Sequence, residues 1–213
     1  MRPSHGHDAT TRRLSFDALL NALDGVAYVV APDGVILQVG EPRWSDNARG
    51  HSAPGLIGDL AVGRNLFDMS IGPDVKAVQE RMHRQVIDGG APVVSFEYRC
   101  DRPEKLRRMR LSITPLIDGP NTIAALYHSI MLEEVLRPPL DLFKSFSTDG
   151  NCRHDVPIVT LCSYCHDVSW PTRTESAETI WIAPEDYYRR GGGSEVLVSH
   201  GMCPDCYTRL MSA

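Results

Sequence analysis

Residues 94–100 read VSFEYRC, residues 108–114 read RMRLSIT, and residues 122–131 read TIAALYHSIM. In the first two stretches apolar side chains occupy alternate positions: Val94, Phe96, Tyr98, Met109, Leu111 and Ile113. Because successive side chains of a strand point to opposite faces, this alternation predicts strands with one buried and one wet face. The third stretch supplies a further strand. Together they predict an antiparallel sheet.

The sequence before these strands predicts helices and a hairpin. Residues 14–23 carry an approximate helical stripe of apolar side chains. Residues 26–40 read as two β-branched runs around a Pro-Asp-Gly turn, which predicts a hairpin. Short helices and loops are expected over residues 41–70. A longer helix is predicted from Pro73 to Ile87, ended by two glycines.

This order of elements resembles the PAS fold over residues 14–135. Four segments carry the resemblance: YVVAPDGVILQV (28–39), GRNLFDM (63–69), VIDGGAPVVSFEYRC (86–100) and RRMRLSITPLIDGPNTIAALYHSIM (107–131). The resemblance implies an α+β fold with an antiparallel five-stranded sheet and flanking helices, and it implies a sensory role. The alternative is another α+β domain built on a five-stranded sheet.

The rest of the chain divides into three further segments. Residues 1–13 are polar and are predicted to be a disordered arm. Residues 136–158 form a linker whose Pro138-Pro139 pair would stop any helix leaving the last strand. PAS sensors often pass signals through such a helix, so that route is not expected here. Residues 159–213 are predicted to be a small cysteine module.

The cysteine module holds two CxxC pairs separated by 37 residues. Its four candidate metal ligands are Cys162, Cys165, Cys203 and Cys206. Two such turns can converge, and four thiolates complete a tetrahedral Zn²⁺ shell with Zn–S distances of about 2.3 Å. The gap exceeds the ~15–20 residues of ordinary zinc ribbons, so a folded insert is expected. A helix over 183–190, a strand over 196–200 and a small core are predicted there. That core comprises Trp170, Trp181, Ile182, Tyr187 and Leu197.

The module also resembles a zinc-type tail found after PAS or receiver domains of bacterial signalling proteins. The segments LCSYCHDV (161–168) and SHGMCPDCYTRL (199–210) match its pattern CxxC…W…Y…SHGxCPxC. The resemblance implies a metal-binding module in a signalling setting. His166 departs from it, because the usual tail has Lys or another polar residue there.

Other readings of the cysteines remain open. Cys162 to His166 fits CxxCH, the attachment site of c-type haem, although the second CxxC would then have no role. The same four thiols could form a redox switch or hold an iron–sulfur centre. His200 and His166 are candidate outer-sphere donors or substitute ligands, and the alternative for His200 is a turn histidine bonded to backbone. Cys100 is predicted to be a small buried hydrophobe.

A small-molecule pocket is a further hypothesis, because PAS domains often hold a ligand between the sheet and the helices. The residues expected to line it are Tyr28, Phe67, Met82, Phe96, Tyr98, Met109 and Ile113, with Trp44 as an addition. The alternative is a filled core. His83 on the long helix and His128 in the last strand are candidate haem ligands. The neighbours Arg81 and Arg84 place His83 near the solvent face in this reading.

The composition and the absence of known motifs exclude several classes of function. With 22 Lys+Arg against 27 Asp+Glu, the net charge of −5 argues against a nucleic-acid-binding surface. No stretch approaches ~18 apolar residues, so no membrane span is expected. The first residues lack the apolar core of a secretory signal, so a cytoplasmic location is expected. No kinase, nucleotide-binding or hydrolase motif is found, so the chain is not expected to be an enzyme.

The sequence therefore predicts a cytoplasmic bacterial sensor or adaptor. In this reading a PAS domain joins a structural zinc module and acts through contacts with a protein partner. The amphipathic helix over 14–23 is expected either to pair two copies as a homodimer or to cap its own sheet. The alternatives are a thiol redox sensor or oxidoreductase that uses the CxxC pairs, and a haem-binding PAS sensor.

Overall fold

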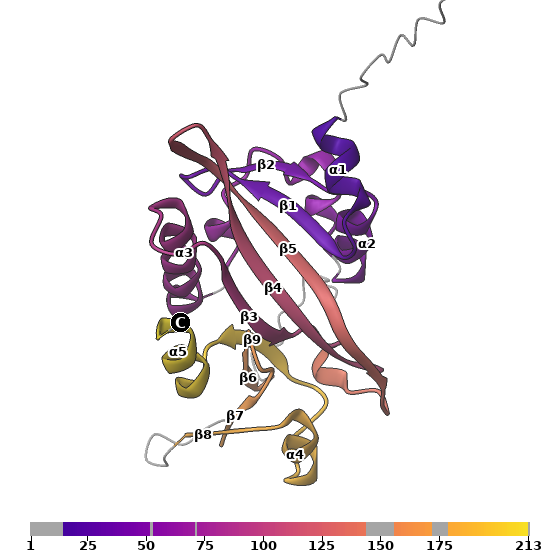
Figure 1. The fold of residues 1–213 in the computed structure, drawn as a ribbon. Coiled ribbons are helices and arrows are strands. Elements are labelled where there is room, and N and C mark those ends of the chain that lie inside the picture. The colour runs from indigo at the N-terminus through magenta and orange to yellow at the C-terminus, as the bar shows by residue number, and fades with distance from the viewer. Residues whose placement is uncertain (1–14, 52, 71, 144–155, 172–178, 213) are drawn as a thin grey trace, which may run out of the picture.

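The computed structural model describes residues 15–51, 53–70, 72–143, 156–171 and 179–212. The predicted N-terminal arm (1–13) and Cys152 lie outside the described residues. Two sheets are present in the described part, one near each end of the molecule, with helices packed around them (Figure 1).

The larger sheet has five antiparallel strands in the order β2-β1-β5-β4-β3. The strands are β1 Val26–Val30, β2 Ile36–Val39, β3 Val94–Arg99, β4 Lys105–Asp118 and β5 Asn121–Leu136. The alternating stretches of the sequence form β3, β4 and β5 as predicted. β4 and β5 make a long hairpin that extends beyond the alternation, so β5 ends at the first residue of the predicted linker.

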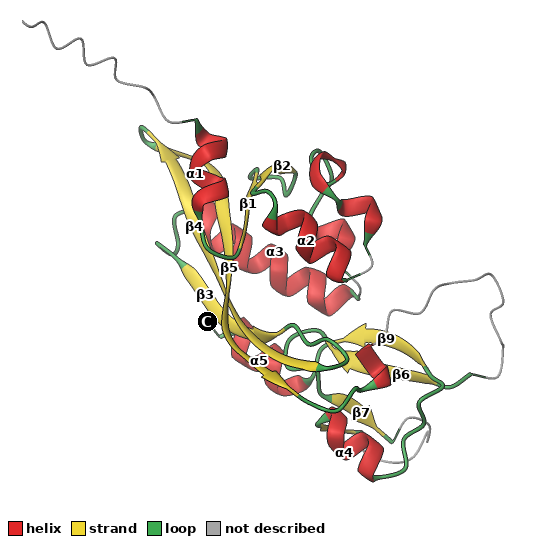
Figure 2. Ribbon diagram, turned by 90° about the vertical axis from the view of Figure 1, so that its right-hand side faces the viewer, coloured by secondary structure: helices red, strands yellow, loops and turns green. Residues whose placement is uncertain are grey.

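Helices cover both faces of this sheet. The helical segments are α1 Phe16–Ala22, α2 Arg43–Gly50, η1 Pro54–Leu56, η2 Gly58–Leu60, η3 Phe67–Met69 and α3 Pro73–Ile87. Leu20 of α1 packs on one face with Ala27 and Val29, whereas α3 packs on the other face with Val30. Figure 2 shows α2 and α3 together on one side of the sheet. The bounds of α3 are those predicted, because proline starts the helix and Gly89, with φ +74°, follows its end.

The smaller sheet has four strands in the order β8-β7-β6-β9. Its strands are β6 Ile158–Cys162, β7 Val168–Trp170, β8 Ile180–Ile182 and β9 Leu197–Gly201. The helical segments around it are η4 Asp141–Phe143, α4 Pro184–Arg189 and α5 Pro204–Met211. β6 and β9 run parallel, and the other two pairs are antiparallel. The predicted helix and strand of the insert are α4 and β9.

The smaller sheet has its own core: Leu142, Val159, Leu161, Val168, Ile182, Tyr187 and Val196. Of the predicted core, Ile182 and Tyr187 are buried and Trp170 packs against them, whereas Trp181 packs against the larger sheet's core. The prediction for Leu197 is wrong, since its side chain is 42% exposed. Val196, the residue before β9, is buried instead, because adjacent residues of an extended chain point to opposite sides.

The two units share one continuous core. Val75, Val78, Met82 and Val86 of α3 pack against the larger sheet, and the same cluster of buried side chains continues into the cysteine module. Its members from that module are Cys162, Tyr164, Cys203, Cys206 and Leu210. α5 also contacts α3 directly. The cysteines are therefore packed into the larger domain rather than held away from it.

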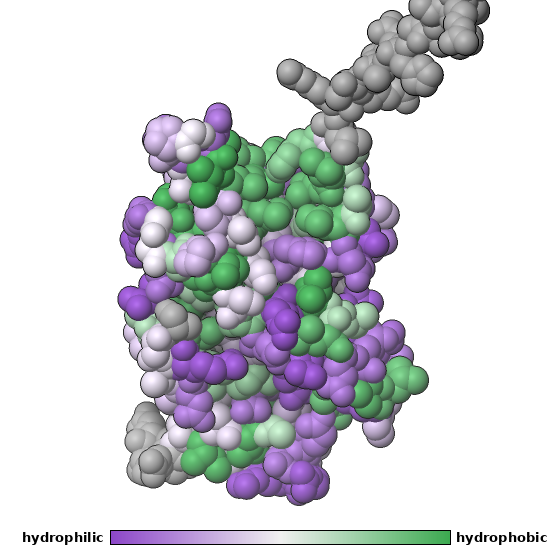
Figure 3. All heavy atoms as spheres, viewed as in Figure 1, coloured by the Kyte–Doolittle hydropathy of each residue, from purple (hydrophilic) through white to green (hydrophobic). Residues whose placement is uncertain are grey.

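Apolar side chains are exposed near α1 and the β4–β5 turn. Phe16 and Leu19 of α1, with Ile117 and Ile123 of the hairpin, are each more than two-fifths exposed. Figure 3 shows hydrophobic residues gathered over this end of the molecule. The homodimer predicted from the N-terminal helix stays a prediction. Among the described helices, none has the length and apolar character needed to cross a bilayer.

Candidate metal centre and sensory pocket

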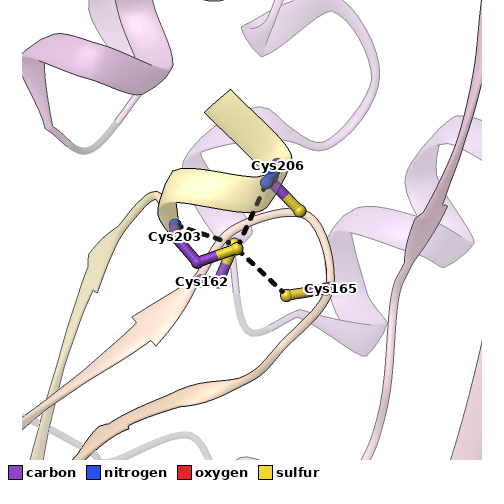
Figure 4. A group of neighbouring side chains, drawn as sticks. All are labelled: Cys162, Cys165, Cys203 and Cys206. Carbon is purple, nitrogen blue, oxygen red and sulfur yellow. Dashed lines mark hydrogen bonds between the residues drawn. The ribbon is translucent and has the colours of Figure 1, made fainter. Parts of the chain in front are cut away.

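The four sulfur atoms of the CxxC pairs meet in one cluster. The Sγ atoms of Cys162, Cys165, Cys203 and Cys206 all lie within 4.8 Å of one another (Figure 4). The Sγ atoms of Cys165 and Cys203 are 3.7 Å apart. A tetrahedron with Zn–S bonds of ~2.3 Å has edges of roughly 3.8 Å. This spacing fits ligands of one metal ion, and it is far longer than the ~2.05 Å of a disulfide.

Parallel pairing of β6 and β9 brings the two CxxC turns together. Cys162, the last residue of β6, pairs with Gly201 at the end of β9. Ser163 N–H then donates to the Gly201 carbonyl at 2.9 Å, so the two chains leave the sheet side by side. Parallel strands end at the same edge of a sheet, which explains how two CxxC pairs with 37 residues between them converge.

Backbone and side-chain donors surround the sulfurs. Cys203 N–H points at Cys162 Sγ and Cys206 N–H points at Cys203 Sγ, both at 3.4 Å. Cys203 is the N-cap of α5, so the positive end of that helix faces the cluster. The Arg209 guanidinium lies 3.6 Å from Cys206 Sγ. These positive groups suit a centre of four thiolates, whose charge exceeds that of one divalent ion.

The thiols influence one another's ionisation. Hydrogen bonds from Cys165 and Cys206 lower the pKa of the Cys162 thiol. The hydrogen bond with Cys162 raises the pKa of Cys165, and it raises that of Cys206 to about 12. Close thiols cannot all carry negative charge without a cation. A divalent ion supplies that charge, so the donor set fits a soft or borderline metal such as Zn²⁺.

Neither candidate histidine belongs to the sulfur cluster. The His166 ring packs on Phe143, and its Nδ1 lies 3.7 Å from the Asp101 carboxylate. His200 lines a shallow hollow with Ser163 and residues near the start of α3. The geometry favours one centre built from both CxxC pairs over haem attachment at Cys162–His166, because the second pair would otherwise be unused.

Asp101 anchors the cysteine module to the larger sheet. Its side chain is fully buried and forms ion pairs with Arg99 and, at 3.0 Å, with Arg137. It also accepts a hydrogen bond from the Arg107 N–H at 3.0 Å. Burial raises the pKa of Asp101, but His166, Arg99 and Arg107 outweigh it and hold the pKa well below the usual range. Arg137 continues to Glu185 of α4 at 3.1 Å.

A cavity of about 220 Å³ lies between the larger sheet, α3 and the first CxxC turn. Its lining residues are Tyr28, Leu66, Val75, Gln79, Met82, Phe96, Tyr98, Leu111, Ile113, Tyr127, Ser163 and Tyr164. Ser163 and Tyr164 are the two residues between the ligands Cys162 and Cys165. The Tyr164 ring lies 5.6 Å from that of Phe96, and its carbonyl accepts the Arg99 N–H at 2.7 Å. The turn that carries two candidate metal ligands therefore forms one wall of the cavity.

All the described side chains that line the cavity are uncharged near pH 7. Burial raises the pKa of Tyr28, and it raises that of Tyr98 to about 12, so both hydroxyls stay neutral near pH 7. The Tyr164 hydroxyl is buried and lies near the Gln79 side chain, but the geometry between the two groups is not that of a hydrogen bond. Drug-sized ligands need ~300–1,000 Å³, so this space suits a smaller molecule. A small neutral ring with one polar group matches the lining.

Five of the seven residues predicted to line a pocket do line this cavity: Tyr28, Met82, Phe96, Tyr98 and Ile113. The other two predictions are wrong. Met109 is buried beside a β-bulge and does not reach the cavity, and Phe67 lines a separate polar hollow with His83. Trp44 packs edge-on behind Tyr28 and donates to the Leu56 carbonyl at 2.6 Å.

The prediction that His83 lies near the solvent face is wrong, since only 1% of it is exposed. Its Nε2 donates to the Ala31 carbonyl at 3.0 Å, so its Nδ1 accepts from the Tyr127 hydroxyl at 2.9 Å. Both ring nitrogens are thus engaged, and neither is free for haem iron. His128 contacts the Asp24 carbonyl, and it follows inward-facing Tyr127, so it points away from the cavity.

Sequence reasoning missed Tyr164, Ser163, Gln79 and Asp101. For Tyr164 the sequence offers one signal, which is an aromatic side chain between two candidate metal ligands. For Asp101 the sequence offers no signal, because its partners lie at scattered positions between residues 99 and 166. Cys100 was predicted to be a buried hydrophobe, but it is partly exposed and contacts His51.

Comparisons with known proteins reach only part of the chain. No family model matches it, and no curated protein matches its sequence. The structure is similar to the PAS domain of BvgS from Bordetella pertussis, at 11% identity over 55% of this chain and 83% of that one, with a TM-score of 0.42. It is also similar to a sensory box sensor histidine kinase from Vibrio cholerae, at 16% identity over 54% and 86% of the two chains, with a TM-score of 0.38.

A third similar structure is the photoactive yellow protein domain of the sensor histidine kinase Ppr from Rhodospirillum centenum. It shares 17% identity over 53% of this chain and 96% of that one, with a TM-score of 0.37. The larger domain is PAS-like. At these levels of similarity, that assignment rests on the chain's own element order and strand pairing, which are those that the sequence resemblance implies.

Proposed function

We propose that this chain is a sensory protein in which Zn²⁺ bound by four cysteines holds the wall of a ligand pocket in the PAS-like domain. The observation that carries the proposal is the position of Ser163 and Tyr164. They lie between two ligands of the candidate metal centre and also line the cavity. A change at the metal centre would therefore move the cavity wall, and a ligand in the cavity would act on the metal centre.

The metal would act on structure rather than on chemistry. Four thiolates fill a tetrahedral shell, so no position is left open for a substrate or water. Cys162, Cys165, Cys203 and Cys206 would hold the ion, while Arg209 and the N-terminus of α5 would balance the excess negative charge of the four thiolates. The small sheet has a limited core of its own, and metal ligation would supply the stability that it lacks.

The signal would leave through surface contacts. The chain after β5 contains Pro138-Pro139, and η4 rather than a long helix follows within the described residues. The cysteine module is then the part best placed to respond, because Tyr164 contacts the pocket and Arg137 joins the end of β5 to α4. A protein partner that binds this module would sense both the ligand and the metal state.

Indole is a suitable probe of the pocket, being a small neutral ring with one N–H donor. In the zinc-loaded full chain, we expect indole to shift the backbone NMR signals of β3, α3 and Ser163–Tyr164. Leu111→Trp should abolish these shifts by filling the cavity, whereas Met131→Trp, at a half-exposed position of β5, should preserve them. Removal of zinc with a chelator should weaken indole binding at least about tenfold, since one wall is lost, which corresponds to ~1.4 kcal/mol.

Two results would contradict this proposal. Indole shifts that survive Leu111→Trp would place the binding site outside the cavity. Equal indole affinity in zinc-loaded and zinc-free protein would show that the metal does not support the pocket wall.

A further inference from the structure

A second thiol site lies at the end of β3, outside the four-cysteine cluster. Cys100 Sγ is 3.2 Å from His51 Nε2, although 49 residues separate them in sequence. Cys100 is partly exposed and His51 is exposed, so small reagents in solvent can reach the pair. The Cys100 N–H is held by the Arg107 carbonyl at 3.0 Å, which fixes the thiol at this position.

The tautomer of His51 is set by its other nitrogen. Nδ1 lies 2.8 Å from the Asn47 carbonyl oxygen. A carbonyl can only accept, so Nδ1 carries a proton and donates it. Nε2 of the neutral ring is then a base that faces the thiol, and it can take the thiol proton to give a thiolate–imidazolium pair. Reactive cysteines in proteins are activated by this arrangement of base and orienting group.

The surroundings of the pair favour the thiolate. The Arg102 guanidinium lies over Gly50, where a Cβ would collide with it, and its Nε is buried without a hydrogen-bond partner among the described residues. Burial raises the pKa of Cys100, but the hydrogen bond with His51, together with the nearby charges of Arg107 and Arg102, lowers it overall. The hydrogen bond with Cys100 raises the pKa of His51. Tyr98, whose hydroxyl is neutral near pH 7, also interacts electrostatically with Cys100.

We propose that Cys100 and His51 form a nucleophilic pair that reacts with hydrogen peroxide, which makes Cys100 a site of oxidation to sulfenic acid. The thiolate sulfur attacks one peroxide oxygen, so an S–O bond forms and the O–O bond breaks. The departing hydroxide takes the imidazolium proton of His51 and leaves as water. Sulfur is oxidised by two electrons to sulfenic acid, and the peroxide is reduced. This site does not depend on the metal centre or the pocket.

The rate of Cys100 alkylation tests the pair directly. Iodoacetamide is added to the zinc-loaded full chain over a range of pH, and the Cys100 peptide is quantified by mass spectrometry. At pH 7 an unperturbed thiol is only a few per cent ionised, so we expect folded Cys100 to react several-fold faster than in urea-unfolded protein. His51→Gln should slow the folded reaction about tenfold, and the matched variant His128→Gln should leave it unchanged.

A peroxide experiment extends the test to the proposed chemistry. With hydrogen peroxide and dimedone, the sulfenic acid adduct should form on Cys100 in the wild type and fall by a similar factor in His51→Gln. Circular dichroism of each variant reports that it is folded. The proposal is overturned if folded Cys100 reacts more slowly than the unfolded chain at pH 7. It is equally overturned if His51→Gln and His128→Gln react at the wild-type rate.

Discussion

Cys203→Ser is expected to abolish metal binding and to unfold the small sheet in the full-length chain. Structural zinc contributes an apparent ~10–16 kcal/mol to small metal-dependent folds at pH 7. That is as large as the whole stability of a typical domain, ~5–15 kcal/mol, so β6 to β9 should not persist without the ion. Zinc content by elemental analysis and amide hydrogen exchange resolved along the chain measure the two effects.

The shared core adds a second expected change in Cys203→Ser. Cys203 belongs to the same buried cluster as Val75 and Val86 of α3, so protection should also fall in α3 and β3. It should fall less in β1, because Ala27 and Val29 of that strand pack on Leu20 of α1, although Val30 shares the cluster with Cys203. Cys152→Ser, a thiol outside both CxxC pairs, is the matched control and should keep zinc and full protection. Unchanged exchange in β6 to β9 of Cys203→Ser would contradict a structural role for the metal.

Asp101→Asn is expected to destabilise the protein by roughly 3–5 kcal/mol, because removing one member of a buried ion pair leaves its partner charge uncompensated. Here Arg99 and Arg137 would both lose the charge of the fully buried Asp101. Among the described residues, only Arg137 would keep a second carboxylate, that of Glu185. Asparagine keeps the size of the side chain, so the loss would be electrostatic rather than a packing defect. Urea unfolding of the zinc-loaded protein, followed by circular dichroism, gives the change in free energy.

The matched control for Asp101 is Glu97→Gln. Glu97 pairs with Arg108 and Arg110 on the exposed face of the sheet, where solvent screens the charges, and it should change stability little. In Asp101→Asn, hydrogen exchange should also rise around His166, which faces the carboxylate. Equal stability of the two variants would show that Asp101 does not anchor the cysteine module.

The parts of the fold that sequence could predict are those with local signals. Alternation predicted β3 and β4, and a proline start with a glycine stop predicted the bounds of α3. The clustering of the four cysteines could also be predicted, because CxxC spacing is typical of metal-binding turns. Each of these signals lies within a few residues of the element that it predicts.

The parts that sequence could not predict depend on contacts between distant residues. His83 lies between two arginines, and only its partners Tyr127 and Ala31 explain its burial. Whether Tyr164 would enter the cavity depends on the Arg99 N–H that holds its carbonyl. The Cys100–His51 pair likewise joins β3 to the end of α2, and no periodic pattern marks either residue.

Metal content of the purified wild-type chain tests the central claim most directly. The account predicts one zinc ion per folded chain, no visible absorption band, and four thiols that resist a thiol reagent until a chelator is added. A folded, metal-free chain whose four CxxC thiols all react at once would contradict it. Bound iron with a visible absorption band would contradict the assignment of zinc.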